Sequence, residues 1–391
     1  RSTNNTKLYA INAPITLNAD SQIALSGGGG LTLQSLAVIS GPYGVAYNGV
    51  IGGTNYSSPI NIDSANTYIG TSTINYGTVT VSTANAFGNA SSAIVLGAPS
   101  GTIFANLYVK GALTFTRDIT VQAGNTGAAT VGNSDGTAAV FSGNIALNKK
   151  VTLSGANVTG SSVNLTGVIS GSFGVDVSGG SAAGGSVTNG NVTLSNANTY
   201  TGVTTITNGG LKLGNNNAVN GSSGVTVNGG NVFDLAGYSL SNAVNLANGA
   251  YLTNTNTSNI SELSGGITLN TAANISASAN ATLLISTNPI TQASGVTSSL
   301  TIGGGGRAGT VSIGVGGNTY TGGTSINIQA TLKVSSNDAL AGTGNISILT
   351  VGRLDVAGNT VSNAVVINSP VTNQALIYSS TGYGGAITGG I

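Results

Sequence analysis

The feature that most constrains this chain is an internal repeat with a period of about 120–130 positions, present three times. The matching segments are ITLN, IALN and ITLN at 15–18, 145–148 and 267–270, and Asn-Thr-Tyr at 66–68, 198–200 and 318–320. Since independent markers agree on one register, the repeat is a structural unit that stacks on its own copies. We therefore expect one continuous solenoid over residues 1–391, with super-repeats at about 1–137, 138–260 and 261–391.

A shorter period lies inside the long one. Asn-Gly pairs begin at Asn189, Asn208, Asn228 and Asn248, at successive intervals of 19, 20 and 20 in the numbering. If coils with this period of about 20 continue along the whole chain, each long unit contains six coils and the chain makes roughly 19. A fourth copy of the long unit is expected to begin at Gly384, in the sequence GGAIT.

The segments between these turns predict short β-strands. Segments such as 211–213 (LKL) and 225–227 (VTV) alternate apolar and polar residues, which places the apolar side chains on one face. Glycine, 62 of 391 residues, interrupts every candidate helix. Strands this short form weak hairpins but can pair in parallel with the equivalent strand one coil away. The expected fold class is all-β, a parallel β-helix or β-solenoid; a sandwich or barrel array is the alternative.

The apolar strand positions are expected to fill the interior of the solenoid. Six residues are predicted to be buried: Ile145, Leu147, Leu211, Leu213, Val225 and Val227. An apolar fraction of 40% argues against a disordered chain. No stretch approaches the ~20 apolar residues of a transmembrane helix, so no membrane span is expected.

One segment carries a family resemblance. Residues 192–213 read VTLSNANTYTGVTTITNGGLKL, and related copies occupy 317–326 and, more weakly, 64–74. This sequence resembles the passenger-associated transport repeat, also called the autotransporter-associated β-strand repeat. The resemblance implies a right-handed parallel β-helix in a secreted passenger region of a large bacterial surface protein, and it implies no catalytic residue. The chain opens without Met, which fits a processed chain or a segment of a longer one.

Composition limits the chemistry available to this chain. There is no Cys and no His, which excludes a typical zinc site, an iron–sulfur cluster and a Ser-His-Asp triad. A net charge of +1 gives no electrostatic footprint for nucleic acid. The one adjacent basic pair, Lys149-Lys150, is interpreted as a solvated corner. We expect no cofactor, no metal and no catalytic residue, and a chelator is expected to leave melting unchanged.

A carbohydrate-acting parallel β-helix enzyme is the alternative function. Glycoside hydrolysis needs two carboxylates roughly 5–10 Å apart. Asp118 with Asp135, and Asp338 with Asp355, are each separated by 17 in the numbering, which is close to one predicted coil. However, Asp234 and Asp355 occupy matching repeat positions. A carboxylate repeated in this way indicates a turn residue in each copy, so an enzyme is not expected.

Three further patterns admit a binding interpretation, and a structural role is favoured for each. The sequence GNSDG around Asp135 is the only oxygen-rich turn with a carboxylate, but it is interpreted as a plain turn rather than a calcium loop. The glycine tract 303–306 lacks the Gly-Lys-Ser/Thr of a phosphate loop. The repeated tyrosines are interpreted as packing at coil corners rather than as sugar platforms: Tyr68, Tyr200 and Tyr320.

These features together predict an extracellular structural or adhesive β-solenoid of a bacterial surface: a stalk, a filament subunit or an adhesin passenger. The expected partner is a second copy bound end to end. A solenoid has an unpaired strand edge at each end, and a net charge near zero removes repulsion between copies. Cell-surface or polysaccharide contacts are the second partner class, and no nucleic-acid partner is expected.

Overall fold

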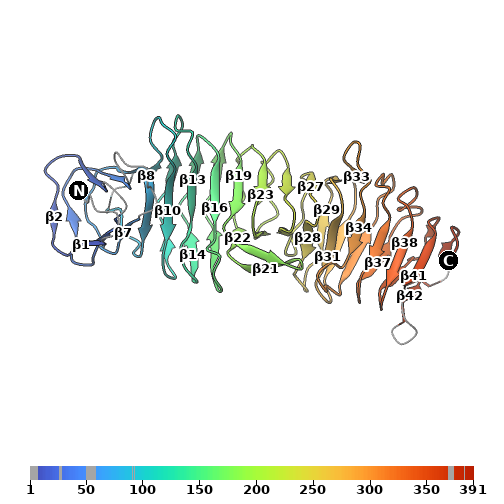
Figure 1. The fold of residues 1–391 in the computed structure, drawn as a ribbon. Helices are drawn as coiled ribbons and strands as arrows, with labels where there is room; N and C mark the ends of the chain where they lie inside the picture. The colour runs from blue at the N-terminus through green and yellow to red at the C-terminus, as the bar shows by residue number, and fades with distance from the viewer. Residues whose placement is uncertain are drawn as a thin grey trace. The chain divides into compact units, whose positions relative to one another are not determined.

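The computed structural model describes residues 8–25, 29–49, 59–89, 91, 93–368, 374–382 and 384–391. This part of the chain contains 43 strands and no helix. The strands stack in parallel as a β-solenoid of about 15 turns (Figure 1). The chain divides into two compact units: unit 1 is Arg1–Gly180 with Asn189–Gly202, and unit 2 is Ser181–Thr188 with Val203–Ile391. The expected all-β solenoid is thus confirmed.

Unit 1 has three strand faces, which the chain visits in the order A, B, C. Face A consists of β3 (Ser21–Ala24), β6 (Val45–Asn48), the first half of β8 (Ser72–Val81), β9 (Ile94–Leu96), β12 (Ile119–Val121), β15 (Ile145–Leu147) and β18 (Ile169–Gly171). Face B consists of β1 (Tyr9–Ile11), β4 (Leu31–Leu33), β7 (Ile60–Ile62), the second half of β8, β10 (Ala105–Val109), β13 (Ala129–Asn133), β16 (Val151–Ser154) and β19 (Val175–Ser178). Face C consists of β11 (Thr114–Phe115), β14 (Ala138–Phe141), β17 (Ser162–Leu165) and β22 (Asn191–Leu194). A separate pair is formed by β2 (Ile15–Thr16) and β5 (Ile39–Ser40).

Unit 2 also has three faces, visited in the order D, E, F. Face D consists of β23 (Thr204–Ile206), β25 (Val225–Val227), β27 (Val244–Leu246), β30 (Ile267–Leu269) and β33 (Ile290–Gln292). Face E consists of β24 (Gly210–Leu213), β26 (Val232–Asp234), β28 (Tyr251–Asn254), β31 (Ala273–Ala277), β34 (Leu300–Ile302), β36 (Thr324–Ile326), β38 (Ile346–Leu349) and β41 (Val365–Asn368). Face F consists of β29 (Ser261–Leu263), β32 (Thr282–Ile285), β35 (Thr310–Ile313), β37 (Thr331–Val334), β39 (Arg353–Asp355) and β42 (Leu376–Tyr378). Two smaller elements complete it: the hairpin of β20 (Ser181–Ala183) and β21 (Ser186–Asn189), and the pair β40 (Thr360–Val361) and β43 (Ala386–Ile387).

The interior is filled by the alternate apolar residues of these strands. In face C, for example, Phe115, Phe141, Leu165 and Leu194 lie in register and are at most 1% exposed. All six residues predicted to be buried are at most 2% exposed, which confirms the prediction for the core. A parallel, in-register stack places every inward residue on its counterpart one coil away, so period-two alternation is enough to build a continuous core.

Aromatic rings form a short column inside unit 1. The ring centroids of Tyr47 and Phe87 are 5.5 Å apart, those of Phe87 and Phe115 are 6.0 Å apart, and those of Phe115 and Phe141 are 5.7 Å apart. The first two pairs meet edge to face, which is a favourable arrangement for aromatic quadrupoles. This column extends through successive coils of the core.

The predicted constant coil period of about 20 is wrong, and with it the count of roughly 19 coils. Paired residues are as few as 19 positions apart, as in Ile60 with Val79, and as many as 29, as in Leu31 with Ile60. The spacing of the Asn-Gly pairs at Asn208, Asn228 and Asn248 reflects the locally short coils between β23 and β27. Elsewhere the corners contain extra residues, so fewer coils accommodate the chain.

Copies of the long repeat in unit 2 lie on successive faces rather than on the same face. The segment TTI at Thr204–Ile206 is on face D, whereas its copy TSI at Thr324–Ile326 is on face E. Val244 and Val365 also occupy the same position of the repeat. Val244 is on face D, and Val365 is on face E, five coils and one face further along the chain. The long unit therefore contains about five and a third coils rather than six. Within unit 2, the third copy is therefore rotated by one face relative to the second.

The fourth copy begins at Gly389, not at Gly384 as predicted. The amide of Val244 donates to the Gly266 carbonyl at 2.9 Å, and the amide of its copy Val365 donates to the Gly390 carbonyl at 2.9 Å. Gly265 and Gly389 also lie in equally tight places. A Cβ added to Gly265 would lie 2.0 Å from the Asn242 carbonyl oxygen, and a Cβ added to Gly389 would lie 2.2 Å from the Ser362 carbonyl oxygen. The GGAIT sequence instead leads into β43, which pairs with β40.

Candidate functional site

The asparagine and the tyrosine of each repeated Asn-Thr-Tyr triplet face the interior of the coils, and the threonine between them is exposed. The side-chain oxygen of Asn66 accepts a hydrogen bond from the Ile39 amide at 2.8 Å, and that of Asn318 accepts one from the Ile290 amide at 2.6 Å. The Asn66 amide group then donates to the Ala86 carbonyl on the following coil at 2.6 Å. Each asparagine therefore links coils where no strand ladder does so, which satisfies buried backbone groups.

The tyrosine of each triplet is fully buried. Tyr68, Tyr200 and Tyr320 are all 0% exposed, so their interpretation as packing residues is confirmed. The hydroxyl of Tyr320 lies 2.7 Å from that of Thr324, and the hydroxyl of Tyr68 lies 2.8 Å from that of Ser72. Burial raises the pKa of Tyr320 to about 12, although its hydrogen bonds with hydroxyl groups act in the opposite direction.

The two repeated aspartates stabilise left-handed turns. Asp234 accepts a hydrogen bond from the Ala236 amide at 2.9 Å, and Asp355 accepts one from the Ala357 amide at 2.9 Å. Both alanines have positive φ, 51° and 47°, a conformation that costs energy for any residue with a Cβ. Each aspartate also accepts from the next coil: Asp234 from the Thr255 amide, and Asp355 from the Ser380 amide. The prediction of a turn role from the repeated position is confirmed.

Asp135, the calcium candidate, is surrounded by hydrogen-bond donors. Its carboxylate accepts from the Thr137 hydroxyl at 2.6 Å and amide at 3.1 Å, and from the Gly111 amide at 2.8 Å. Burial raises the pKa of this carboxyl. The hydrogen bonds from Thr137 and Gly111 and the charge of Lys110 together lower it by more than burial raises it, so the pKa lies below its ordinary value. Among the described residues no group of three or more metal-ligating side chains is found. The geometry is that of a plain turn.

Three further carboxylates accept hydrogen bonds within the fold. Asp20 accepts from the Gly44 amide and Asp118 from the Asn144 amide, each at 2.7 Å. Asp63 accepts from the Ser82 hydroxyl at 2.6 Å. Asp118 precedes a strand of face A, whereas Asp135 follows a strand of face B, so the two members of this pair lie at different corners of the coil. Asp338 lies in the turn after β37 and Asp355 at the end of β39, both strands of face F, and the register partner of Asp355 is Lys333, five positions before Asp338.

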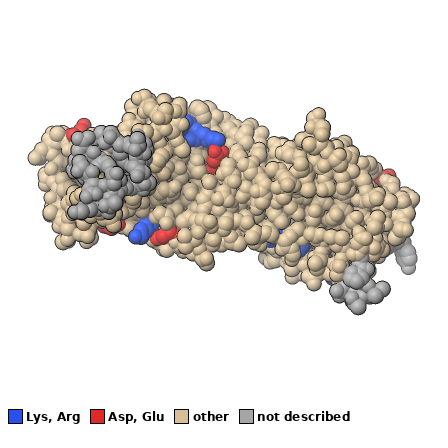
Figure 2. Space-filling view, in the orientation of Figure 1, with Lys and Arg blue, Asp and Glu red and all other residues tan. Residues whose placement is uncertain are grey.

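The basic pair Lys149-Lys150 is more than a solvated corner. The Lys149 ammonium donates to the carbonyls of Asn125 at 3.0 Å and Gly127 at 2.5 Å, one coil away. Lys150 forms an ion pair with Asp176 at 2.7 Å. Burial lowers the pKa of Lys149. On the face of the molecule in Figure 2, charged groups are few and scattered over an otherwise uncharged surface.

The tip of the β20–β21 hairpin packs against the glycine tract 303–306. A Cβ added to Gly305 would lie 1.5 Å from the Gly184 carbonyl oxygen at the hairpin tip. Arg307 donates to the Gly185 carbonyl at 2.5 Å and to the Ser186 hydroxyl at 3.2 Å. This contact joins residues more than 120 positions apart. The tract thus allows close backbone approach, and no phosphate-loop geometry is present in it.

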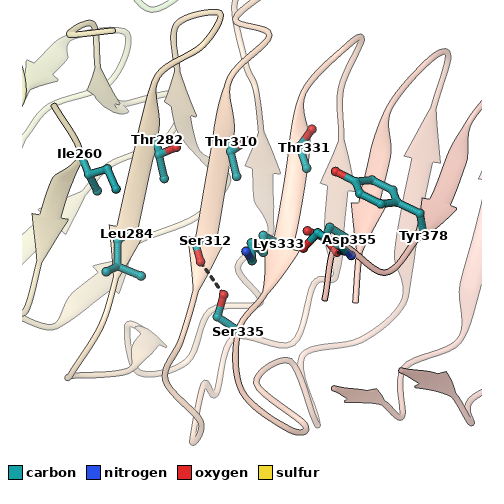
Figure 3. A pocket seen from close by; sticks show the side chains of 11 residues that line it. Ile260, Thr282, Leu284, Thr310, Ser312, Thr331, Lys333, Ser335, Asp355 and Tyr378 are labelled. Carbon is teal, nitrogen blue, oxygen red and sulfur yellow. Dashed lines mark hydrogen bonds between the residues drawn. The ribbon is translucent and has the colours of Figure 1, made fainter. Parts of the chain in front are cut away.

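A groove on face F is the candidate functional site of unit 2. It is a hollow of about 380 Å³ along the outer side of β32, β35, β37 and β39, and Tyr378 of β42 stands at one end (Figure 3). The strands place alternate residues outward here, because Leu283, Val311 and Leu332 point into the core and are 0% exposed. Two rows of outward side chains result, in strict parallel register.

The first row consists of threonines. Thr282, Thr310 and Thr331 are register partners on three successive strands, about 4.8 Å apart along the axis. We call this the threonine row. Beyond it, Tyr378 reaches back so that its hydroxyl approaches that of Thr331 (Figure 3). Burial raises the pKa of Tyr378, as does the nearby Asp355.

The second row carries the charged groups. Leu284, Ser312, Lys333, Asp355 and Tyr378 are successive register partners, and we call them the central row. The Ser312 hydroxyl lies 2.7 Å from that of Ser335 (Figure 3). Within the described part of the chain the only ion pair is Lys150 with Asp176, so no described carboxylate lies within ion-pair distance of Lys333. The groove therefore combines aligned hydroxyls, one aromatic ring and one open ammonium.

The sequence interpretation did not identify this groove. Its signal is present, since three strands begin with the related triplets TLL at 282–284, TVS at 310–312 and TLK at 331–333. These triplets align because the first coil advances the numbering by 28 and the second by 21. A constant period of about 20 does not predict that alignment.

Comparisons with known proteins give no relative for this chain. No family model matches it, no curated protein is similar to it, and no solved structure matches it. Within the described residues there is no helix of the length and apolar character needed to cross a membrane.

Proposed function

We propose that this chain is an extracellular structural and adhesive β-solenoid of a bacterial surface, serving as a stalk, filament subunit or adhesin passenger. The observation that carries the proposal is the use of the repeated motif. Its asparagines and tyrosines face the interior and link successive coils, so repetition maintains the fold. A motif selected for binding would instead place its polar residues on the surface.

The carboxylates support the same proposal. Seven of the nine acids accept hydrogen bonds or an ion pair within the fold: Asp20, Asp63, Asp118, Asp135, Asp176, Asp234 and Asp355. Acid catalysis needs a carboxyl group that is free to exchange a proton with substrate. The resemblance to the passenger-associated transport repeat favours display on the cell surface.

Self-association is part of this proposal. The coils are joined by parallel ladders, and a second copy can continue a ladder wherever a coil edge is open. With 10 basic and 9 acidic residues in a chain of 391, little repulsion opposes such contacts.

The test combines electron microscopy of the purified chain with a search for polysaccharide cleavage. We expect rods or fibres and no new reducing ends or unsaturated products. Isolated rods at all concentrations would contradict self-association while leaving the stalk and adhesin roles. Cleavage of a polysaccharide by the purified chain would establish the enzyme alternative and overturn the proposal.

A further inference from the structure

We infer that the groove on face F is a binding site for an acidic polysaccharide, a chain of sugar rings that carry carboxylates. This inference deepens the adhesive part of the proposed function and rests on it. It follows from the juxtaposition of the threonine row, Lys333 and Tyr378 along one groove.

The hydroxyl groups of the groove suit a ligand rich in hydroxyls. Thr282 and Thr310 are half-buried, and Ser312 and Thr331 form the floor at 6% exposure. Each hydroxyl can both donate and accept a hydrogen bond, as sugar hydroxyls do. Because the row repeats at about 4.8 Å, close to the length of one sugar ring, successive rings can each meet one rung. Tyr378 offers an amphipathic ring at the end of the row.

The charge balance favours an acidic ligand. Lys333 lies at the centre of the groove with an open ammonium, and Arg353 is its exposed neighbour in β39. The one carboxylate beside them, Asp355, is 2% exposed and accepts hydrogen bonds from the amides of Ala357 and Ser380 at 2.9 Å. Glu262 is three register steps from Lys333, about 14 Å away. A carboxylate on the ligand would therefore meet a net positive centre.

An acidic peptide fits this site less well. Peptides bind to sheets mainly by adding a strand at an open edge. β32, β35, β37 and β39 are paired on both sides, so no edge is open within the groove. Recognition must therefore come from side chains, and these offer hydroxyls and an ammonium over a shallow surface.

The experiment measures binding of a galacturonate hexamer, with a neutral glucose hexamer as the comparison probe. The full chain should bind the acidic probe, and Lys333→Ala should weaken that binding about tenfold. Thr310→Val, which keeps the side-chain shape, should weaken it about threefold through the lost hydroxyl. Melting curves of both variants should match the unchanged chain, since these side chains lie outside the core.

Lys212→Ala is the matched control. Lys212 and Lys333 occupy the same position of the repeat, in LKL and LKV, but Lys212 is on face E. Equal losses in both lysine variants would show general charge attraction and overturn the site, as would equal binding of the neutral probe or no binding of either. Cleavage of the bound hexamer would contradict the structural role proposed above while leaving the binding site in place.

Discussion

At the residue scale, short polar side chains replace backbone hydrogen bonds wherever the strands end. Asn66 and Asn318 span coils inside the core, and Asp234 and Asp355 hold left-handed alanines at corners. The sequence predicted a turn role for the aspartates because their repeated position is visible in one dimension. Their second partners, Thr255 and Ser380, lie on the next coil. The sequence did not predict these partners, because which residue lies opposite each aspartate depends on the length of the local coil.

Substitutions of Asp234 test whether its carboxylate stabilises the turn by accepting hydrogen bonds. Asp234→Asn keeps an oxygen for the amides of Ala236 and Thr255, so it should cost less than about 1 kcal/mol. Asp234→Ala leaves those buried donors without an acceptor and should cost about 2–3 kcal/mol. Chemical denaturation of the two variants measures the difference. Equal losses of stability would show that the negative charge, rather than the acceptor, stabilises the turn.

Val351 occupies a position that glycine fills in equivalent turns. Its φ is 52°, a conformation that a β-branched residue rarely adopts, whereas Gly249 and Gly358 at the same turn position have φ of 72° and 80°. Val351→Gly should therefore raise the free energy of unfolding by roughly 1 kcal/mol. Thr350→Gly, one residue earlier and without positive φ, should lower it by about 0.5–1 kcal/mol. Thermal melts of the two variants that shift in the same direction would contradict this account.

At the scale of elements, the strands could be predicted but their faces could not. Period-two alternation identifies a strand such as Val225–Val227 without reference to any neighbour. The face on which a strand lies depends on the sum of all corner lengths before it, and paired positions differ by 19 in one coil and by 29 in another. The groove depends on that sum, because Thr310 and Thr331 meet only when their coil advances the numbering by 21. The hairpin seat was missed for the same reason.

Gly305 tests how the β20–β21 hairpin is seated. In Gly305→Ala, the added Cβ would lie 1.5 Å from the Gly184 carbonyl oxygen if the backbone did not shift, so the hairpin must move. Gly306→Ala is the matched control, since its φ of 74° is like the 75° of Gly305 but no atom lies within 4 Å of the added Cβ. Hydrogen exchange over residues 181–188 should accelerate at least about tenfold more in the first variant than in the second.

The hairpin variants also test the role of Arg307. If equal exchange is found in the two glycine variants, then Arg307 and not the close backbone approach holds the hairpin, through its bonds to Gly185 and Ser186. If the close approach is what seats the hairpin, Arg307→Ala should have a smaller effect on exchange than Gly305→Ala.

At the scale of the whole molecule, stability depends on apolar stacking, on hydrogen bonds between uncharged groups and on hydrogen bonds to a few carboxylates. With no His and no Cys, no side chain has an ordinary pKa near neutrality, so stability should be flat between about pH 6 and 9. On the acid side, the lowered pKa of Asp135 means that its contribution is present above the unfolded value and is lost as pH falls through the folded value. Melting temperature measured from pH 9 down to below the ordinary pKa of Asp gives the profile.

The alkaline limit is set by buried tyrosines, and Tyr320 isolates one of them. Burial raises its pKa to about 12, against about 10 in the unfolded chain, so its contribution is complete below pH 10 and is lost as pH rises to 12. At about 1.4 kcal/mol per unit, this loss amounts to about 3 kcal/mol. Tyr320→Phe should therefore cost about 1 kcal/mol at pH 7, through the missing bond to Thr324, but should decline less steeply above pH 10. Tyr43→Phe, at a tyrosine that is 40% exposed, is the control and should follow the unchanged chain throughout. Parallel alkaline profiles for Tyr320→Phe and the unchanged chain would show that Tyr320 ionises without unfolding its coil.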